Sequence, residues 1–365
     1  MKGIYIHVPF CRKACRYCDF YFTVSLQYRD DYVEGILREI KLRQDYLGGG
    51  MVDTVYFGGD TPSVLTIPQI KVFMESLRNS FRIRKKAEIT LEANPDDLTP
   101  DYLREIRALG FNRLSIGVQS FREKDLKLMN RSHDARQAIQ CLDDVQKAGF
   151  HDVNMDLIYG IPGLDPEQWE ENLLMTMKQP VQHLSAYHLT YEPGTVFDHW
   201  RKKGKLTPLP EESSVKQYEI LCRIAADRGF SHYEISNFAR PGFISRHNSL
   251  YWRGGTYLGL GPSAHSFDLH SRQWNVASLK KYLEGLERGY GYYEHEQLGS
   301  RERFHETLIT SLRMSRGINV RQVRHSFGDP VYRHMMAQAS RFLESGALVL
   351  KRGHLKMTEE SWFVA

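Results

Sequence analysis

Cysteine is scarce in this chain, and long hydrophobic runs and a strong excess of charge of either sign are missing. Five cysteines in 365 residues are too few for a disulfide scaffold. No run of about 18 apolar residues argues for a membrane-spanning helix, and no apolar signal segment precedes the first expected strand. A net charge of +5 is small for this length and does not indicate nucleic-acid binding. We therefore expect a cytoplasmic protein in a reducing compartment, for which only peripheral association with a membrane stays open.

Three of the five cysteines lie within eight residues, at Cys11, Cys15 and Cys18. They follow a short β-rich run that ends at Val8, so we expect them in one loop directly after a strand. Three thiolates in a tight loop can bind three corners of a cubane iron–sulfur cluster and leave one iron open to a small molecule. The main alternative is a zinc site that adds His7, because Cys3His is a common zinc set. Zinc modules usually have a second pair of ligands far away in sequence, and the pattern therefore favours iron–sulfur.

The other two cysteines, Cys141 and Cys222, are expected to be structural. Each lies on the apolar face of a predicted helix, where a free cysteine behaves as a small hydrophobic residue.

Strand and helix patterns alternate about six times between residues 3 and 191, with short connections, which predicts an α/β fold with a parallel sheet. Six repeats are too few for a closed eight-fold barrel, so an open, partial (β/α)6 barrel fits. Polar or glycine-rich clusters follow the strands in succession. Because ligands bind at the carboxyl ends of parallel strands, we expect these clusters to form one large site.

The remainder of the chain is expected to be less regular. Residues 247–252 are predicted to be non-helical, and residues 290–297 to form an irregular linker. Helices followed by a hairpin over 346–357 indicate a small winged-helix-like α+β domain, whose basic residues we interpret as a solvated face. The expected limits are 1–240 for the core domain, 241–297 for a connecting segment and 298–365 for the C-terminal domain.

The cysteine loop resembles that of the radical S-adenosylmethionine (SAM) superfamily, in which an aromatic residue, here Tyr17, precedes the third cysteine. The resemblance implies the partial barrel fold. It also implies that Cys11, Cys15 and Cys18 hold a 4Fe–4S cluster, and that SAM binds the open iron through its amino and carboxylate groups. An electron donor is implied as a partner, since one electron cleaves SAM to the 5′-deoxyadenosyl radical in this superfamily.

Residues at the strand ends match SAM contacts of the coproporphyrinogen-oxidase-like branch of the superfamily. Tyr5 matches a tyrosine on the adenine side. Gly58, Gly59, Asp60 and Thr61 match a G-G-G-T run that lines the SAM amino group, except that Asp60 replaces the third glycine. Its carboxylate would repel the SAM carboxylate or attract the SAM ammonium. The other implied SAM contacts are Glu92, Gln119, Arg131 and Asp156.

The motif H-N-x-x-Y-W, which begins at His247, resembles that of the HemW-type heme chaperones within this branch. The resemblance implies that His247 ligates heme iron while Tyr251 and Trp252 stack on the porphyrin. From the residues alone, a hydrogen-bonded core histidine beside core aromatics is the commoner arrangement, and both interpretations stay open.

The resemblance covers nearly the whole chain and predicts a heme chaperone that binds heme, a 4Fe–4S cluster and SAM and delivers heme to hemoproteins. The alternative is an oxygen-independent coproporphyrinogen III dehydrogenase, a radical SAM enzyme of porphyrin biosynthesis. That relative carries a fourth cysteine, in the pattern C-x3-C-x2-C-x-C, and an extension before the first strand. Phe20 stands in the place of the fourth cysteine here, and the chain starts almost at the strand, which favours the chaperone.

Overall fold

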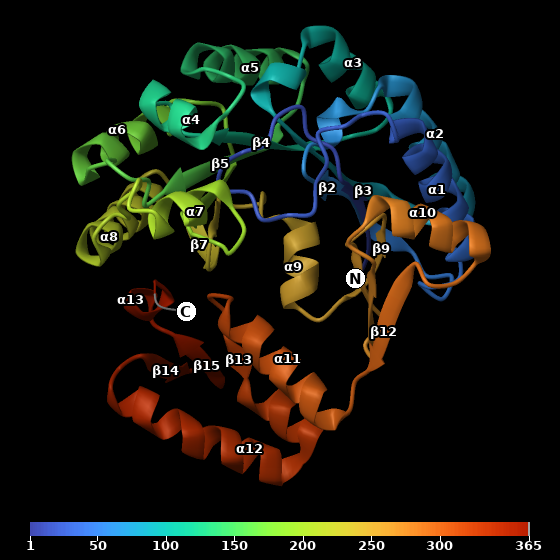
Figure 1. Ribbon diagram of the computed structural model, residues 1–365. Coiled ribbons are helices and arrows are strands. Elements are labelled where there is room, and N and C mark those ends of the chain that lie inside the picture. Colours follow the sequence, from blue (N-terminus) through green and yellow to red (C-terminus); the bar gives the residue numbers. More distant parts are fainter. Residues whose placement is uncertain (364–365) are drawn as a thin grey trace.

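In the computed structural model, which describes residues 1–363, six parallel strands follow one another in chain order within a 12-stranded sheet (Figure 1). These strands are β1 (Lys2–Val8), β2 (Val52–Gly59), β3 (Ile83–Ala93), β4 (Arg113–Gln119), β5 (Asp152–Tyr159) and β6 (His183–His188). Each pairs in parallel with the next. The predicted α/β fold with six parallel strands is confirmed.

Helices cover the outer face of this sheet and give it the curvature of a partial barrel (Figure 1). Every residue of β4 is buried, as expected for a parallel strand covered on both faces. Asp134 and Asp165 each cap a helix with their side chains, which explains why helices begin directly after them. The helices are α1 (Arg29–Leu42), α2 (Ile67–Ser80), α3 (Pro100–Ala108), α4 (Glu123–Met129), α5 (Ala135–Lys147), α6 (Pro166–Thr176), α7 (Val196–Lys202), α8 (Glu211–Asp227) and α10 (Leu279–Arg288), with short 3-10 turns at Pro62–Val64 and Pro95–Asp97.

Further strands extend the sheet on both sides. On one side β9 (Thr256–Leu260) pairs in parallel with β1, and β10 (His265–Phe267), β11 (Ser271–Asn275) and β12 (Tyr293–Gln297) follow in antiparallel order. On the other side β8 (Asn237–Ala239) and β7 (Ser231–Glu234) follow β6. Among the described residues β12 and β7 are the two edge strands of the sheet.

The linker expected over residues 290–297 is wrong in its second half, because residues 293–297 form β12. All five residues of this edge strand are exposed, so the sequence carries no apolar alternation that would have indicated a strand. The predicted connecting segment therefore contributes strands to the sheet of the core domain, while the domain limits themselves stay a prediction.

The motif segment, expected to be non-helical, forms the helix α9 (Arg246–Trp252). The Glu88 carboxylate of β3 accepts hydrogen bonds from the backbone N–H groups of Arg246 and His247, each at 2.8 Å. Ser245 accepts a further hydrogen bond from Asn248 N at 3.2 Å. A local N-cap, Ser245, and a carboxylate about 160 positions away in the chain therefore cap this helix together, and only the distant cap lies beyond local sequence patterns.

The C-terminal domain has its own small core and a three-stranded sheet in the order β13–β15–β14. Gly328 interrupts α12 with a positive φ of 86°, so two helices meet there before Pro330. Helix, strand, two helices and a hairpin in this order form the expected winged-helix-like α+β arrangement. Its elements are α11 (Ser300–Leu312), β13 (Ile318–Asn319), α12 (Val320–Glu344), β14 (Leu348–Lys351), β15 (His354–Met357) and α13 (Glu359–Trp362). No helix of residues 1–363 is long and apolar enough to cross a membrane.

Candidate cofactor site

The cysteine loop lies between β1 and α1 and is closed at its base by backbone hydrogen bonds. Cys11 N donates to Thr23 O at 3.0 Å, and Thr23 N donates to Pro9 O at 2.8 Å. At the other end of the loop, Arg16 N donates to Met129 O at 3.1 Å, next to the end of α4. The loop is thereby held over the carboxyl ends of the strands.

The three thiols are half-buried and close to polar groups of other strands. Cys11 Sγ lies 3.3 Å from the Thr61 hydroxyl, and Arg131 Nη1 donates to Cys15 Sγ at 3.4 Å. Burial raises the pKa of Cys11 and of Cys18 to about 12, so these thiols are protonated at neutral pH in the metal-free protein. Iron or zinc must displace these protons, because the thiolate is the ligand form.

The three sulfurs of the loop are not gathered around a single point in this structure. In the described part of the chain, Cys11, Cys15 and Cys18 do not all lie within 4.8 Å of one another, with or without His7. Sulfurs around one tetrahedral zinc lie about 3.8 Å apart, given Zn–S bonds of about 2.3 Å. His7 is buried and its Nδ1 is hydrogen-bonded to the Tyr5 hydroxyl at 3.1 Å. His7 Nε2 has no hydrogen-bond partner among the described residues. The expectation of a 4Fe–4S cluster therefore rests on the resemblance of the loop to the radical SAM superfamily.

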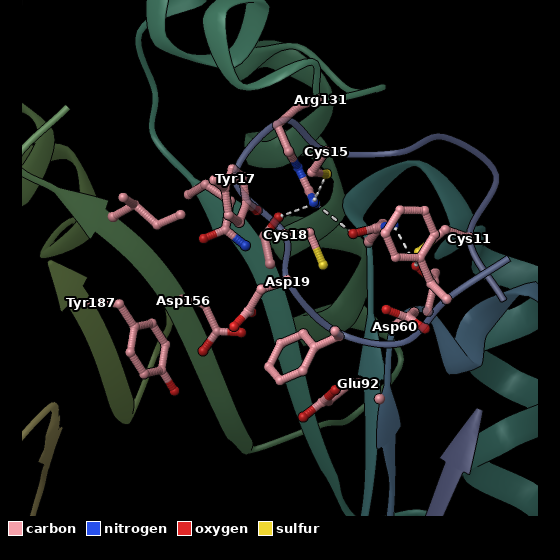
Figure 2. Close-up of a pocket in the computed structure, with 18 of the residues that line it drawn as sticks. Cys11, Cys15, Tyr17, Cys18, Asp19, Asp60, Glu92, Arg131, Asp156 and Tyr187 are labelled. Carbon is pink, nitrogen blue, oxygen red and sulfur yellow. Dashed lines mark hydrogen bonds between the residues drawn. The ribbon is translucent and has the colours of Figure 1, made fainter. Parts of the chain in front are cut away.

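A cavity of about 400 Å³ opens beneath this loop, and we call it the cysteine pocket (Figure 2). It collects side chains from the ends of β1 to β6. Of the residues predicted to contact the cluster or SAM, it is lined by Tyr5, Cys11, Cys15, Cys18, Gly59, Asp60, Thr61, Glu92, Gln119, Arg131 and Asp156. Gly58 and His247 do not line it. Lining residues that the sequence analysis did not single out include Asp19, Asn94, Ser115, Tyr187 and His188, of which Asn94, Tyr187 and His188 also lie at strand ends.

Two glycines allow the chain to enter this pocket closely. A Cβ at Gly58 would lie 2.7 Å from the Tyr56 ring and 2.9 Å from the Tyr5 ring. Gly59 has a φ of +106°, and a Cβ there would lie 2.9 Å from Val8 O. The missing side chain of Gly58 therefore leaves room for the rings of Tyr5 and Tyr56 next to the pocket. Gly59 lines the pocket itself, and its positive φ is a backbone conformation that favours glycine.

Four carboxyl groups line this pocket, those of Asp19, Asp60, Glu92 and Asp156 (Figure 2). Burial, with Glu92 as the next contribution, raises the pKa of Asp60 to about 8. Burial also raises the pKa of Glu92 to about 8 and raises the pKa of Asp156. Both Asp60 oxygens are buried without a hydrogen-bond partner among the described residues. Burial and mutual repulsion make these carboxyl groups costly to ionise. A cationic ligand in the pocket lowers that cost, so the pocket favours a cationic ligand.

Arg131 supplies positive charge on the opposite side of the pocket, beside Cys15 (Figure 2). Its Nη2 donates to Gly117 O at 2.7 Å and to the side chain of Asn94. Its Nε has no partner within residues 1–363. A ligand that carries both a cationic group and a carboxylate, as SAM does, matches this separation of charges, and the three cysteines match a three-ligand cluster.

His247 lies in the core rather than in a cofactor cavity. Its side chain is about 1% exposed, its Nδ1 is hydrogen-bonded to the Thr54 hydroxyl at 2.7 Å, and its Nε2 to the Tyr251 hydroxyl at 2.8 Å. The ring also stacks on Tyr56 at 4.9 Å. Both nitrogens are engaged in this conformation, so His247 offers no free position for heme iron, and the hydrogen-bonded interpretation fits the structure.

A second cavity, of about 720 Å³, lies between α9 and the C-terminal domain, and we call it the motif cavity. It reaches Tyr251 and Trp252, the last two residues of the H-N-x-x-Y-W motif. Its aromatic, basic and imidazole groups are Tyr251, Trp252, Tyr257, Phe267, Phe327, Arg253, Arg272, Arg303, Arg316, His265 and His354.

Comparison with known proteins agrees with this geometry. The radical SAM superfamily model matches residues 5–175, and the HemN C-terminal domain model matches residues 298–364. A heme chaperone HemW from Bacillus subtilis is 33% identical over 332 residues, which covers 90% of this chain and 87% of that protein. A heme chaperone HemW from Synechocystis is 36% identical, with 87% of this chain and 79% of that protein covered.

Among solved structures, the coproporphyrinogen III oxidase HemN from Escherichia coli, a radical SAM enzyme, matches with a TM-score of 0.87 and 25% identity. The match covers 100% of this chain and 88% of that protein. The fold, the cysteine loop and the similarity over most of the sequence therefore agree, and the chain belongs to the HemW family of the radical SAM superfamily.

Proposed function

We propose that this protein is a heme chaperone that binds heme together with a 4Fe–4S cluster and SAM, and that passes the heme to recipient hemoproteins. The name of its HemW relatives supports this proposal, and so does the presence of two separate cavities. One cavity has the ligands for a cluster and SAM. The other has the groups that hold a porphyrin.

In the cysteine pocket, Cys11, Cys15 and Cys18 would hold the cluster. A three-ligand cluster supplies one open iron for the amino and carboxylate groups of SAM. Arg131 is placed to neutralise the SAM carboxylate, while Asp60 and the other buried carboxyls attract its cationic groups. An external electron donor completes the set of partners.

The motif cavity is the observation on which the heme-carrier function mainly depends. Its volume is in the range of small-molecule sites in proteins, about 300–1,000 Å³. Rings of Tyr251, Trp252 and Tyr257 offer flat apolar surface to a porphyrin, as aromatic side chains do in many ligand sites. Arginines at its rim, such as Arg253 and Arg316, suit the two heme propionates.

Two histidines in this cavity are better placed than His247 to ligate iron. Burial and the nearby Arg272 lower the pKa of His265, so its ring is neutral at pH 7. His354 Nδ1 lies 3.3 Å from Arg352 O and donates to it, which leaves Nε2 as the lone-pair nitrogen. That Nε2 has no hydrogen-bond partner among the described residues. Neutral imidazole is the form that binds heme iron.

The alternative function, coproporphyrinogen III dehydrogenase, is favoured by the structural likeness to HemN. Decarboxylation of two propionates requires each to be held in a fixed position near the radical carbon, and small displacements lose most of the rate. Phe20 lines the cysteine pocket where the dehydrogenase pattern has its fourth cysteine, and it is 63% exposed. We therefore propose that SAM binds without coproporphyrinogen III turnover.

One experiment separates the two functions. Protein reconstituted with iron and sulfide under anaerobic conditions is tested in parallel for heme binding and transfer to an apo-hemoprotein, and for coproporphyrinogen III turnover with SAM and dithionite. We expect heme binding and transfer, with no protoporphyrinogen formed. Multiple SAM-dependent turnovers without heme transfer would refute the chaperone proposal and establish the dehydrogenase.

A further inference from the structure

A cysteine, a histidine and a glutamate from three separate elements meet where the end of the chain returns to the core domain. Cys222 lies on α8, His232 on β7 and Glu359 at the start of α13. Cys222 Sγ and His232 Nδ1 are 4.0 Å apart, and His232 Nδ1 and Glu359 Oε1 are also 4.0 Å apart. All three ligand atoms lie within 4.8 Å of one another.

The orientation of His232 is that of a metal-ligating imidazole. Its Nε2 lies 3.3 Å from Ile235 O, and because a carbonyl can only accept, Nε2 carries the proton. The lone pair is then on Nδ1, which faces Cys222 and Glu359. Ligating histidines commonly donate their second N–H to a backbone carbonyl, because that bond fixes the tautomer and the ring.

Packing holds the His232 ring in this position. Phe238 stacks on one face at 4.0 Å with an interplanar angle of 13°, and the ring of Trp362 meets it edge-on at 4.3 Å. The imidazole is 9% exposed, whereas the Glu359 side chain is 68% exposed and free to turn toward it. Ligand atoms around tetrahedral zinc lie about 3.4–3.6 Å apart, so the two separations of 4.0 Å at His232 Nδ1 need to close by about half an ångström. The rotation of the exposed Glu359 side chain can bring its carboxylate closer to Cys222, from which it lies within 4.8 Å.

We propose that Cys222, His232 and Glu359 form a binding site for one divalent cation of the zinc class, with water in the fourth position. Thiolate, imidazole and carboxylate are all zinc ligands, and binding releases the Cys222 thiol proton to solvent. The site is distinct from the cysteine pocket and independent of the heme-carrier proposal. It reverses the purely structural role expected for Cys222.

Such a site would fasten the end of the chain to the wall of the cysteine pocket. Glu359 begins the short helix whose Trp362 is buried in the main core. The next residue, Phe363, packs against His188 with ring centroids 6.0 Å apart, and His188 lines the cysteine pocket. A metal at this position would therefore join α13 to α8 and β7, next to the contact of Phe363 with the end of β6 in that pocket.

The test uses the full chain with Cys11, Cys15 and Cys18 replaced by Ala, so that the cluster loop takes up no metal. Titration with Co²⁺ is followed by the thiolate-to-cobalt charge-transfer absorption and the visible bands of tetrahedral cobalt. We expect one Co²⁺ per chain, displaced by Zn²⁺. Cys222→Ser should abolish the charge-transfer band, and the matched control Cys141→Ser should leave it unchanged.

A second pair of variants tests the Glu359 carboxylate. A second measurement keeps the proposal testable if the chain without Cys11, Cys15 and Cys18 does not fold. Glu359→Gln should weaken Co²⁺ binding at least tenfold, while Glu360→Gln on the same turn should not. In the otherwise unchanged chain with its cluster reconstituted, zinc content after dialysis should be one per chain, and none with Cys222→Ser. No saturable binding, or binding that Cys222→Ser does not alter, would overturn the proposal.

Discussion

The two cavities of this protein differ in how they are assembled. The cysteine pocket combines one short loop with residues of six consecutive parallel strands, and it places buried carboxyl groups and Arg131 on opposite sides. The motif cavity combines residues 251–272 with residues 303–354, from two domains, and is aromatic and basic. The cysteine pocket is a property of the α/β fold, whereas the motif cavity exists only because the C-terminal domain packs against α9.

This difference implies separate functions that can be removed one at a time. The cysteine pocket is matched to a cationic ligand that carries a carboxylate, and the motif cavity to a flat ligand with acidic side chains. The predictions below test that separation.

The largest expected effect is loss of the cluster. Replacement of Cys11, Cys15 or Cys18 by Ala should abolish binding of about four irons per chain, because each thiolate holds one corner of the cubane. Heme affinity should stay within about twofold if the motif cavity is independent, since substitutions far apart act additively. Iron analysis and heme titration measure the two effects, with Cys141→Ala as the control. Stoichiometric zinc in place of iron would contradict the prediction.

His247→Ala should destabilise the fold by about 2–4 kcal/mol, because it empties a core position and leaves two hydroxyl groups without their partner. Urea denaturation measures this loss. Tyr251→Phe, which removes one of the two hydrogen bonds, should lose only about 1 kcal/mol. An unchanged stability together with an altered heme spectrum would restore His247 as a heme ligand.

We expect one of the two histidines of the motif cavity, His265 or His354, to ligate heme iron. Replacement of that residue by Ala should weaken heme binding about tenfold, which corresponds to about 1.4 kcal/mol. The same variant should shift the Soret band, and the iron–sulfur content should not change. His295, on the exposed strand β12, provides a matched control. If neither cavity histidine affects the heme spectrum, the proposed place of the heme is wrong.

Asp60→Asn should weaken SAM binding about fivefold at pH 9, about 1 kcal/mol for a partly screened charge. Since the pKa of Asp60 is about 8 in the ligand-free protein, its carboxyl group is mostly protonated below pH 7, and binding of a cation there must first release this proton. The affinity of the unchanged protein should therefore rise between pH 6.5 and 9, and more steeply than that of the variant. Tighter binding in Asp60→Asn would show that this carboxylate faces the SAM carboxylate instead.

Glu92→Gln should have the smallest effect, an increase of about 2 °C in the melting temperature of the ligand-free protein at pH 8. The pKa of Glu92 is about 8 in the folded protein, above the value of about 4.3 for an exposed glutamate. The folded state therefore binds the extra proton, and stability falls as pH rises from about 4 to about 8. Glutamine does not ionise, so the variant does not lose stability in this way as the pH rises. Its side-chain oxygen can still accept the hydrogen bond from the Tyr56 hydroxyl. The prediction would be contradicted if the melting temperature of the unchanged protein did not fall between pH 5 and pH 8 relative to that of the variant.

Local sequence determined much of the core domain and of the cysteine pocket. Strand patterns, glycines and helix caps lie within a few residues of the elements that they specify, and parallel strands bring their carboxyl ends to one edge. For that reason the strand patterns suffice to predict one large site at that edge. The resemblance to the radical SAM superfamily assigns residues as far apart in the chain as Tyr5 and Asp156 to this site, and both line the same cavity.

Tertiary structure alone decided the role of the motif helix, the motif cavity and the site around His232. Glu88 caps α9 from a distant strand, and His247 is engaged by Thr54, so the motif histidine lies in the core instead of in a cavity. Glu359 reaches His232 only after the chain has folded back on itself. Each of these contacts joins residues more than 100 positions apart, and no local pattern in the sequence encodes such a contact.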